Sequence, residues 1–219
     1  MLGRDRGRSA GGASPVGSVA RARSRSGGPE PTQPEAPATV ERASPGLAAL
    51  FGALRADGRH SFLDLGAASA ANLNVCGRFA SQIRFAGGSP HPSAVAAEEA
   101  AAASLPPNVD RPYDVVLAWD TLDWLDEPGR RTLVERVVDI TAASARLYLV
   151  VDASTTPTRR RTRATLLDTD RVAQRPVGPE EPRGRPLLPA QVEQLIAPFE
   201  VQHAYSLRTG LREYVAIRR

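Results

Sequence analysis

The sequence contains a single cysteine, no lysine and no long apolar run. Cys76 has no second cysteine to pair with, so an internal disulfide is excluded and a reducing compartment is expected. No stretch approaches the roughly 18 consecutive apolar residues that a membrane-spanning helix needs. The first residues also lack the apolar core of a signal peptide. These absences predict a cytoplasmic protein without a membrane partner.

The distribution of arginine argues against a simple nucleic-acid-binding domain. The 219-residue chain has a formal net charge of +4. Residues 1–26 hold six Arg and one Asp, whereas residues 27–151 hold 10 Arg against 15 acids. A folded surface that binds nucleic acid carries a basic stripe, and the central part of this chain has none. Nucleic-acid binding through the N-terminal segment stays open but is not favoured.

Residues 1–45 are rich in Gly, Ser, Pro, Ala and Arg and contain few large apolar side chains. Such a segment cannot bury enough surface to offset the entropy lost on ordering, so we predict a disordered tail. Within it, Arg21–Ser26 either contacts RNA or an acidic partner or is simply solvated. Ser44 and Pro45 mark the start of a helix, and a single domain is expected over residues 46–219.

The stretch 61–74, SFLDLGAASAANLN, is the part around which the rest of the domain is organised. It begins as a short buried strand containing one acid, Asp64, and continues through the very small residues Gly66–Ala71 into a segment with helical spacing. Small residues between a strand and a helix let a ligand approach the backbone closely. Ligands of open α/β sheets bind at this carboxyl edge. The alternative is a turn kept small for packing only.

This stretch resembles motif I of the class I S-adenosylmethionine-dependent methyltransferases, where an acid is followed by glycines at alternate positions. Asp64 and Gly66 match, while Ala68 and Ala70 stand where the second and third glycines usually do. The resemblance implies S-adenosylmethionine as the cofactor. It also implies that the small residues line the methionine end and that Asn72 helps to hold the methionine carboxylate at the helix N-terminus.

A second informative stretch, YDVVLAWDTLDWL at residues 113–125, predicts a buried strand with an acid at its carboxyl end. It resembles the fourth strand of the same family and the loop after it. Trp119 and Asp120 are therefore expected to flank the pocket, with Asp120 and Asp64 positioning the amine of the cofactor. The alternative is that Asp120 caps a helix starting at Thr121 and that Trp119 belongs to the core. The cofactor-binding residues implied by the resemblance are Asp64, Gly66, Ala67, Ala68, Asn72, Trp119 and Asp120.

Two acids that are typical of the family are missing. The second strand, predicted at Gln82–Phe85, runs into Ala86–Ser89 without the Asp or Glu that would accept hydrogen bonds from both ribose hydroxyls. Ser93–Ala103 is predicted to be a helix. The acid expected to face the adenine amino group, at the end of a third strand, is absent as well. Both departures favour a fold that has lost its pocket.

The rest of the chain predicts the remainder of this fold. A helix over Glu127–Ala143 and an apolar strand at Leu147–Val151 complete a βαβ unit. A short helix at Pro189–Pro198 precedes a hairpin of Glu200–Leu207 and Leu211–Arg218. In class I methyltransferases the last strand inserts antiparallel between the fifth and sixth. We therefore expect an α/β, Rossmann-like methyltransferase fold with a mostly parallel sheet, an antiparallel C-terminal hairpin and helices on both faces.

Residues 152–188 interrupt this pattern as an insertion rich in arginine and proline. After Asp152 this segment holds eight Arg against four acids. Long insertions in compact domains are often functional or disordered. The arginines either recruit an anionic methyl acceptor or belong to a soluble, mobile insertion.

The resemblance implies an enzyme that transfers a methyl group from S-adenosylmethionine to an unknown acceptor. The competing hypothesis is a non-catalytic module whose arginine-rich tail and insertion bind a partner or nucleic acid. A nicotinamide-dependent dehydrogenase fits less well, because the glycine spacing differs. Methyl transfer requires that the edges at Leu65–Gly66 and Trp119–Asp120 be neighbours. Positive φ at Ala68 or Ala70 would indicate strain retained at a site, and a side chain above Gly66 would indicate a closed pocket.

Overall fold

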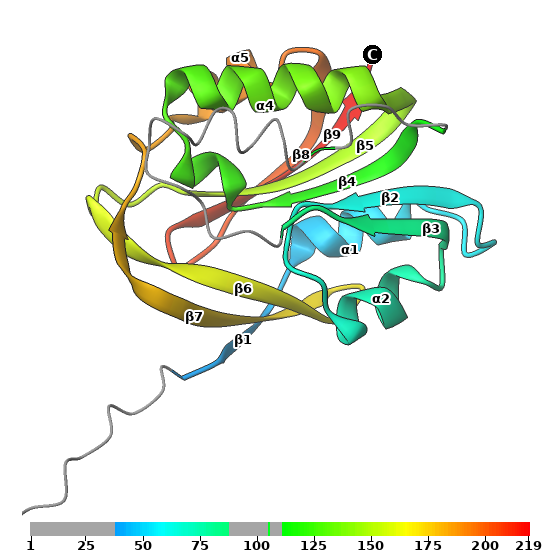
Figure 1. The fold of residues 1–219 in the computed structure, drawn as a ribbon, viewed down its shortest axis with the longest axis horizontal. Helices are drawn as coiled ribbons and strands as arrows, with labels where there is room; N and C mark the ends of the chain where they lie inside the picture. Colours follow the sequence, from blue (N-terminus) through cyan, green and yellow to red (C-terminus); the bar gives the residue numbers. More distant parts are fainter. Residues whose placement is uncertain (1–37, 88–104, 106–110) are drawn as a thin grey trace, which may run out of the picture. The chain divides into compact units, whose positions relative to one another are not determined.

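The strand order of the central sheet positions the rest of the fold. The computed structural model describes residues 38–87, 105 and 111–219. Six strands in this part of the chain form a sheet in the order β3-β2-β4-β5-β9-β8 (Figure 1). These strands are β2 His60–Asp64, β3 Ala80–Phe85, β4 Tyr113–Trp119, β5 Thr141–Asp152, β8 Phe199–Ser206 and β9 Leu211–Arg218.

The strand directions confirm the predicted fold class. Strands β3, β2, β4 and β5 pair in parallel, and β9 lies antiparallel between β5 and β8. This inserted strand is the arrangement expected of the class I methyltransferase sheet. The helix predicted at Ser93–Ala103 and the third strand considered after it lie outside the described residues.

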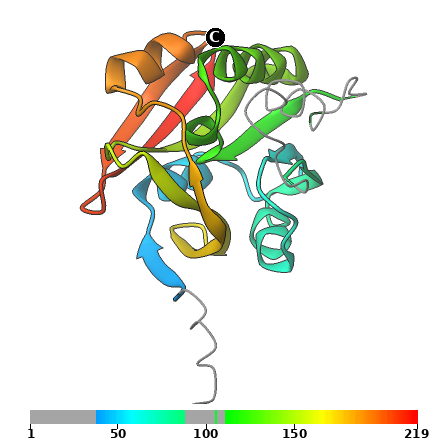
Figure 2. The same ribbon diagram turned by 60° about the vertical axis from the view of Figure 1, so that its left-hand side comes forward.

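Helices cover both faces of the sheet, as predicted. On one face lie α4 (Glu127–Ile140) and α5 (Pro189–Leu195), and on the other lie α1 (Pro45–Gly52) and α2 (Ala70–Cys76) (Figures 1 and 2). No helix in the described ranges is long and apolar enough to cross a membrane.

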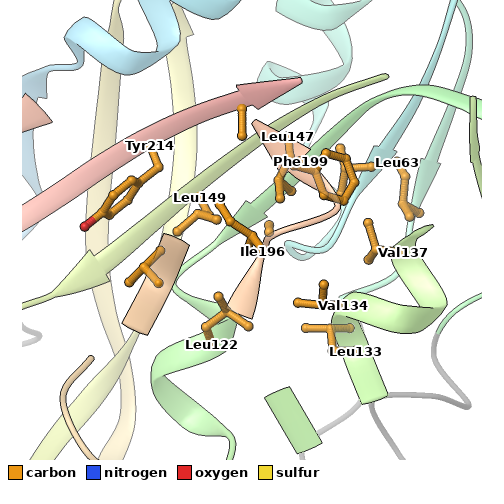
Figure 3. Packing of buried hydrophobic residues seen from close by; sticks show 14 of the residues in the cluster. Leu63, Leu122, Leu133, Val134, Val137, Leu147, Leu149, Ile196, Phe199 and Tyr214 are labelled. Carbon is orange, nitrogen blue, oxygen red and sulfur yellow. The ribbon is translucent and has the colours of Figure 1, made fainter. Parts of the chain in front are cut away.

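Successive residues of the strands feed two separate hydrophobic cores, because side chains alternate between the faces of a strand. Leu63 and Leu147 pack with α4 and α5, around Val137 and Ile196 (Figure 3). The strand residues that point to the other face form a second core with α1. They include Phe62, Val115, Leu117, Tyr148 and Val150. Each fully buried large apolar side chain contributes about 1.5–3 kcal/mol, so both faces of the sheet are held firmly.

Capping residues fix where the helices begin. The Ser44 hydroxyl accepts a hydrogen bond from the Leu47 N–H at 3.2 Å, and Pro45 occupies the first helical position, as predicted. The Asp126 carboxylate accepts from the Gly129 N–H at 2.9 Å at the start of α4. This helix ends before the predicted residue 143, because β5 begins directly at Thr141.

The segment 152–188, expected as an insertion rich in arginine and proline, contains a long β-hairpin. Strands β6 (Thr158–Asp168) and β7 (Arg171–Pro182) pair antiparallel. Strand β1 (Val40–Ala43) pairs with β7 and gives a three-stranded sheet in the order β1-β7-β6. The folded part thus begins before the expected boundary at residue 46. The predicted disorder of residues 1–37 concerns a segment outside the described residues.

Candidate functional site

The carboxyl ends of β2 and β4 are neighbours, as methyl transfer requires. The two strands pair in parallel, and the Leu65 N–H donates to the Leu117 carbonyl at 2.9 Å. A cavity of about 320 Å³ opens at this edge. The 3₁₀ turn η1 (Thr121–Trp124) and strand β6 contribute to its lining. Its lining residues are Leu65, Gly66, Ala67, Gly87, Trp119, Asp120, Thr121, Trp124, Arg161, Thr162, Arg163, Ala164 and Val177.

The structure divides the predicted cofactor residues into two groups. Those that line the cavity are Gly66, Ala67, Trp119 and Asp120. Those that do not are Asp64, Ala68 and Asn72. Asp64 and Asn72 are fully buried, with 1% and 0% of their surfaces exposed, whereas Ala68 is exposed. Four of the seven predicted residues thus line this cavity, and three do not.

Asp64 holds the motif in place from inside the protein. The sequence had instead suggested that it contacts the amine of the cofactor directly. Its carboxylate accepts hydrogen bonds from the Gly66 N–H at 2.7 Å, the Asn72 amide at 3.0 Å and the Trp119 indole at 2.5 Å. Burial raises the pKa of Asp64, and the three hydrogen bonds oppose that rise. With its oxygens engaged inside the protein, Asp64 shapes the turn that a ligand would meet.

Asn72 has a similar internal role. Its amide donates to Asp64, and its carbonyl oxygen accepts from the Leu166 N–H at 2.8 Å. The Asn72 side chain therefore joins the motif to β6 of the hairpin. The sequence predicted that Asn72 would hold the cofactor carboxylate, but both ends of its amide are already bound.

Trp119 carries the backbone strain at this site. Its φ is 50°, and in the described residues the only other non-glycine with positive φ is Ser144. Ala68 and Ala70 do not have positive φ, so the strain considered at these two alanines is absent. A non-glycine residue with positive φ is uncommon, and such a strained backbone conformation persists only where the surrounding contacts hold it. Here the indole N–H bond to Asp64 and an edge contact with Tyr148, at 5.7 Å between ring centroids, fix Trp119.

The Trp119 side chain explains why residue 66 is glycine. A Cβ atom added at Gly66 would lie 2.9 Å from the Trp119 indole nitrogen and 2.9 Å from the nearer Asp64 oxygen. The indole thus occupies part of the volume above Gly66, which is the feature expected of a closed pocket and favours the non-catalytic alternative. The cavity described above is the space that remains beyond it.

The chain that follows β3 closes another side of the cavity. The Gly87 N–H donates to the Gly66 carbonyl at 3.1 Å, and a Cβ atom added at Gly87 would lie only 2.3 Å from the Leu65 carbonyl oxygen. Just after β3 the chain thus passes close to the backbone of the motif, an approach that only glycine allows. Of the lining residues, Asp120 is the one with a carboxylate.

The hairpin supplies residues that the sequence analysis did not assign to the site. The Thr162 hydroxyl donates to Asp120 at 2.9 Å, so Asp120 is held by β6; it makes no side-chain cap to the turn that follows it. The Arg161 guanidinium lies over the Trp124 ring at 4.5 Å from its centroid. The run Arg159–Arg163 is evident in the sequence. Its contacts with Asp120 and Trp124 could not be predicted, because the two segments are far apart along the chain.

Buried charges lie next to this wall of the cavity. Burial raises the pKa of Asp123 to about 7, and the hydrogen bond from the Asp152 N–H, with the charges of Arg183 and Arg159, opposes the rise. Asp152 forms ion pairs with both arginines, at 2.7 Å to Arg183 and 3.0 Å to Arg159. No cluster of His, Cys, Asp and Glu in the described ranges could hold a metal ion. A larger hollow of about 710 Å³ between α4 and α5 contains none of the predicted site residues.

No protein-family model and no curated protein matches the sequence. Several solved methyltransferases have similar folds. The glycopeptide N-methyltransferase MtfA, complexed with S-adenosyl-L-homocysteine, is 17% identical, with a TM-score of 0.44 over 80% of this chain and 89% of that chain. The CcbJ methyltransferase from Streptomyces caelestis is 15% identical, with a TM-score of 0.46 over 80% and 94%.

CalS10, an amino pentose methyltransferase from Micromonospora echinaspora, is 15% identical, with a TM-score of 0.47 over 79% of this chain and 89% of that chain. With these identities and with TM-scores below 0.5, the three similarities give no information about what this chain binds or does.

Proposed function

We propose that this chain binds S-adenosylmethionine at the carboxyl edge of β2 and β4 and transfers its methyl group to an acceptor that enters beside the β6–β7 hairpin. The observation that carries the proposal is the cavity of about 320 Å³ between the Gly66 turn and Trp119–Asp120. Its volume lies in the range of small-ligand pockets, about 300–1,000 Å³. Both strand edges expected from the sequence contribute to its lining.

The residues of the chain have separate tasks in this proposal. Gly66 and Ala67 let the donor approach the backbone closely, and Trp119 forms an apolar wall. Asp120 offers a carboxylate to the donor's amine; Thr162 holds one of its oxygens, and the other has no hydrogen-bond partner in the described residues. The sulfonium supplies an activated methyl group, so the protein contributes mainly alignment of donor and acceptor.

The part of the cavity lining that comes from β6 and β7 is called the hairpin wall; its residues are Arg161, Thr162, Arg163, Ala164 and Val177. This wall adds positive charge on the side where the acceptor would enter. Arg161 and Arg163 line the same cavity as Asp120, the single carboxylate of its lining. An anionic acceptor would be drawn to this wall, and its charge would also complement the sulfonium of the donor.

A second candidate is a non-catalytic module that keeps the fold. The observation favouring it is the internal use of the motif: Asp64 and Asn72 are buried and hydrogen-bonded inside the protein, and the Gly87 N–H donates to the Gly66 carbonyl. In that case the cavity would be too small or too closed for an adenosyl group.

Calorimetric titration with S-adenosylmethionine and S-adenosylhomocysteine distinguishes the two candidates. Methyl transfer predicts saturable binding, weakened about tenfold or more in Asp120→Asn, because a charge-assisted hydrogen bond is lost. The matched control is Asp139→Asn on α4, an exposed acid away from the cavity, which should bind like the natural protein. Absence of heat and of saturation at millimolar ligand would establish the non-catalytic module.

A further inference from the structure

The lining of the cavity contains both tryptophans of the chain together with two arginines. Trp119 ends β4 and Trp124 ends the turn η1, while Arg161 and Arg163 come from β6. The sequence contains two Trp in all. An aromatic surface and cationic side chains therefore meet in one hollow.

Arg161 is held in a fixed orientation. Its guanidinium lies 4.5 Å from the centroid of the Trp124 ring, and its Nε bonds to Glu181 at 3.0 Å. The Arg161 side chain is 26% exposed. A guanidinium has five N–H donors, and the terminal nitrogens of Arg161 have no hydrogen-bond partner in the described residues. Arg161 is thus oriented, yet it keeps donors for a ligand.

Arg163 faces a second arginine. It is directly opposite Arg175 in the register of β6 and β7. Like charges opposite each other on antiparallel strands destabilise the pair, and neither residue forms an ion pair within the described ranges. Both side chains are exposed, and of this pair only Arg163 lines the cavity, so an anion bound there would meet Arg163. Because Glu181 partly neutralises only Arg161, the wall keeps a net positive charge.

We infer that the hairpin wall recognises an aromatic carboxylate. The flat carboxylate would accept paired hydrogen bonds from the planar Arg161 guanidinium. The ring would pack on the indoles and on the apolar Val177 and Leu65, which also line the cavity. This assignment rests on the proposed function in that it makes such a molecule the methyl acceptor, but the binding itself is independent of the donor.

Intrinsic tryptophan fluorescence tests the inference, because both indoles line this cavity and no other tryptophan adds to the signal. The full chain is titrated, without donor, with benzoate, phenylacetate and cinnamate and with the matching neutral amides. Saturable quenching by at least one carboxylate is expected, with the amide of the same ring about tenfold weaker or more. Equal binding of carboxylates and amides, or no quenching at millimolar ligand, would overturn the inference.

Variants of the wall sharpen the test. Arg161→Gln should weaken carboxylate binding about tenfold, while Arg160→Gln, an exposed neighbour on the same strand that does not line the cavity, should bind normally. Glu181→Gln keeps Arg161 and removes the competing carboxylate, so it should bind carboxylates several-fold more tightly. Equal affinity in the two arginine variants, or no tightening in Glu181→Gln, would contradict the inference.

The two proposals fail in different ways. Arginine-dependent binding of a carboxylate together with no binding of S-adenosylhomocysteine would leave the anion site standing and remove methyl transfer. Binding of S-adenosylhomocysteine without any carboxylate binding would give the opposite result.

Discussion

At the scale of single residues, the site depends on a buried carboxylate that faces the protein. Asp64 takes three donors, from the turn at Gly66, from α2 through Asn72 and from β4 through Trp119. A buried charge is tolerated only when such partners surround it. The acid of a motif I pattern can therefore be required for the shape of the turn even where it has no room to meet a ligand.

Asp123 makes the stability of this protein depend on pH. In the folded state burial raises its pKa from 3.8 to about 7. Between those values the folded chain retains a proton on Asp123 that the unfolded chain has lost. The contribution of Asp123 to the free energy of unfolding therefore falls as the pH rises through this window. The charged groups around it are Asp120, Arg130, Arg159 and Arg183.

Asp123→Asn should remove this dependence while its amide oxygen still accepts the Asp152 N–H. The midpoint of thermal unfolding of the variant, measured relative to the natural protein, should rise as the pH is raised from about 5 to about 8. A difference between the two proteins that stays constant over this range would show that Asp123 is ionised throughout.

At the scale of elements, the hairpin is secured at its base by one acid. Asp152, at the end of β5, pairs with Arg159 at the start of β6 and with Arg183 just after β7. The Arg183 side chain is only 1% exposed, and it also donates to the Ser154 carbonyl at 2.6 Å. Both ends of the hairpin form an ion pair with this one carboxylate at the end of β5. The hairpin is therefore fixed relative to the central sheet.

Asp152→Asn should therefore loosen the hairpin and lower the free energy of unfolding by about 2–4 kcal/mol, since two arginines lose their charged partner. Urea unfolding gives the stability, and amide hydrogen exchange over β6 and β7 shows where the protection falls. The control is Asp168→Asn near the tip, where the ion pair with Arg78 is more than half exposed; stability should not change measurably. Equal protection of the hairpin in both variants would argue against this role of Asp152.

At the scale of the whole molecule, the segment before α1 is joined to the last strand by a second buried acid. Glu213 on β9 is fully buried and accepts hydrogen bonds from Arg42, Ser44, the Gly46 N–H and the Tyr148 hydroxyl. Two of these donors lie before residue 45, in the stretch expected to be tail. The unit from residue 37 to 219 contains all of them.

Two truncations test this boundary. A chain of residues 37–219 should keep the unfolding midpoint of the full chain. A chain of residues 46–219 loses β1, Arg42 and Ser44, and should lose about 3–5 kcal/mol, because Glu213 is left as a poorly paired buried charge. Urea unfolding of the three chains gives the comparison. Equal stability of the two truncated chains would place the boundary where the sequence suggested it.

Local sequence patterns were enough to predict the central sheet and one edge of the candidate site. Apolar strands at Phe62–Leu63 and Val115–Leu117, helices with one apolar face and the final hairpin are local patterns, and each follows from the period of its own side chains. Parallel strands leave their carboxyl ends on a common edge, so Gly66 and Trp119–Asp120 could be placed together without coordinates.

Which side chains face the cavity could not be predicted from local patterns, because it depends on contacts between distant elements. Asp64 and Asn72 turn inward because distant groups, the Trp119 indole and the Leu166 N–H, complete their hydrogen bonds. The hairpin was missed because its arginines and prolines give no clear alternation, and its pairing with β1 joins residues more than a hundred positions apart. Contacts of that kind depend on the folded arrangement of several elements, and no local pattern encodes them.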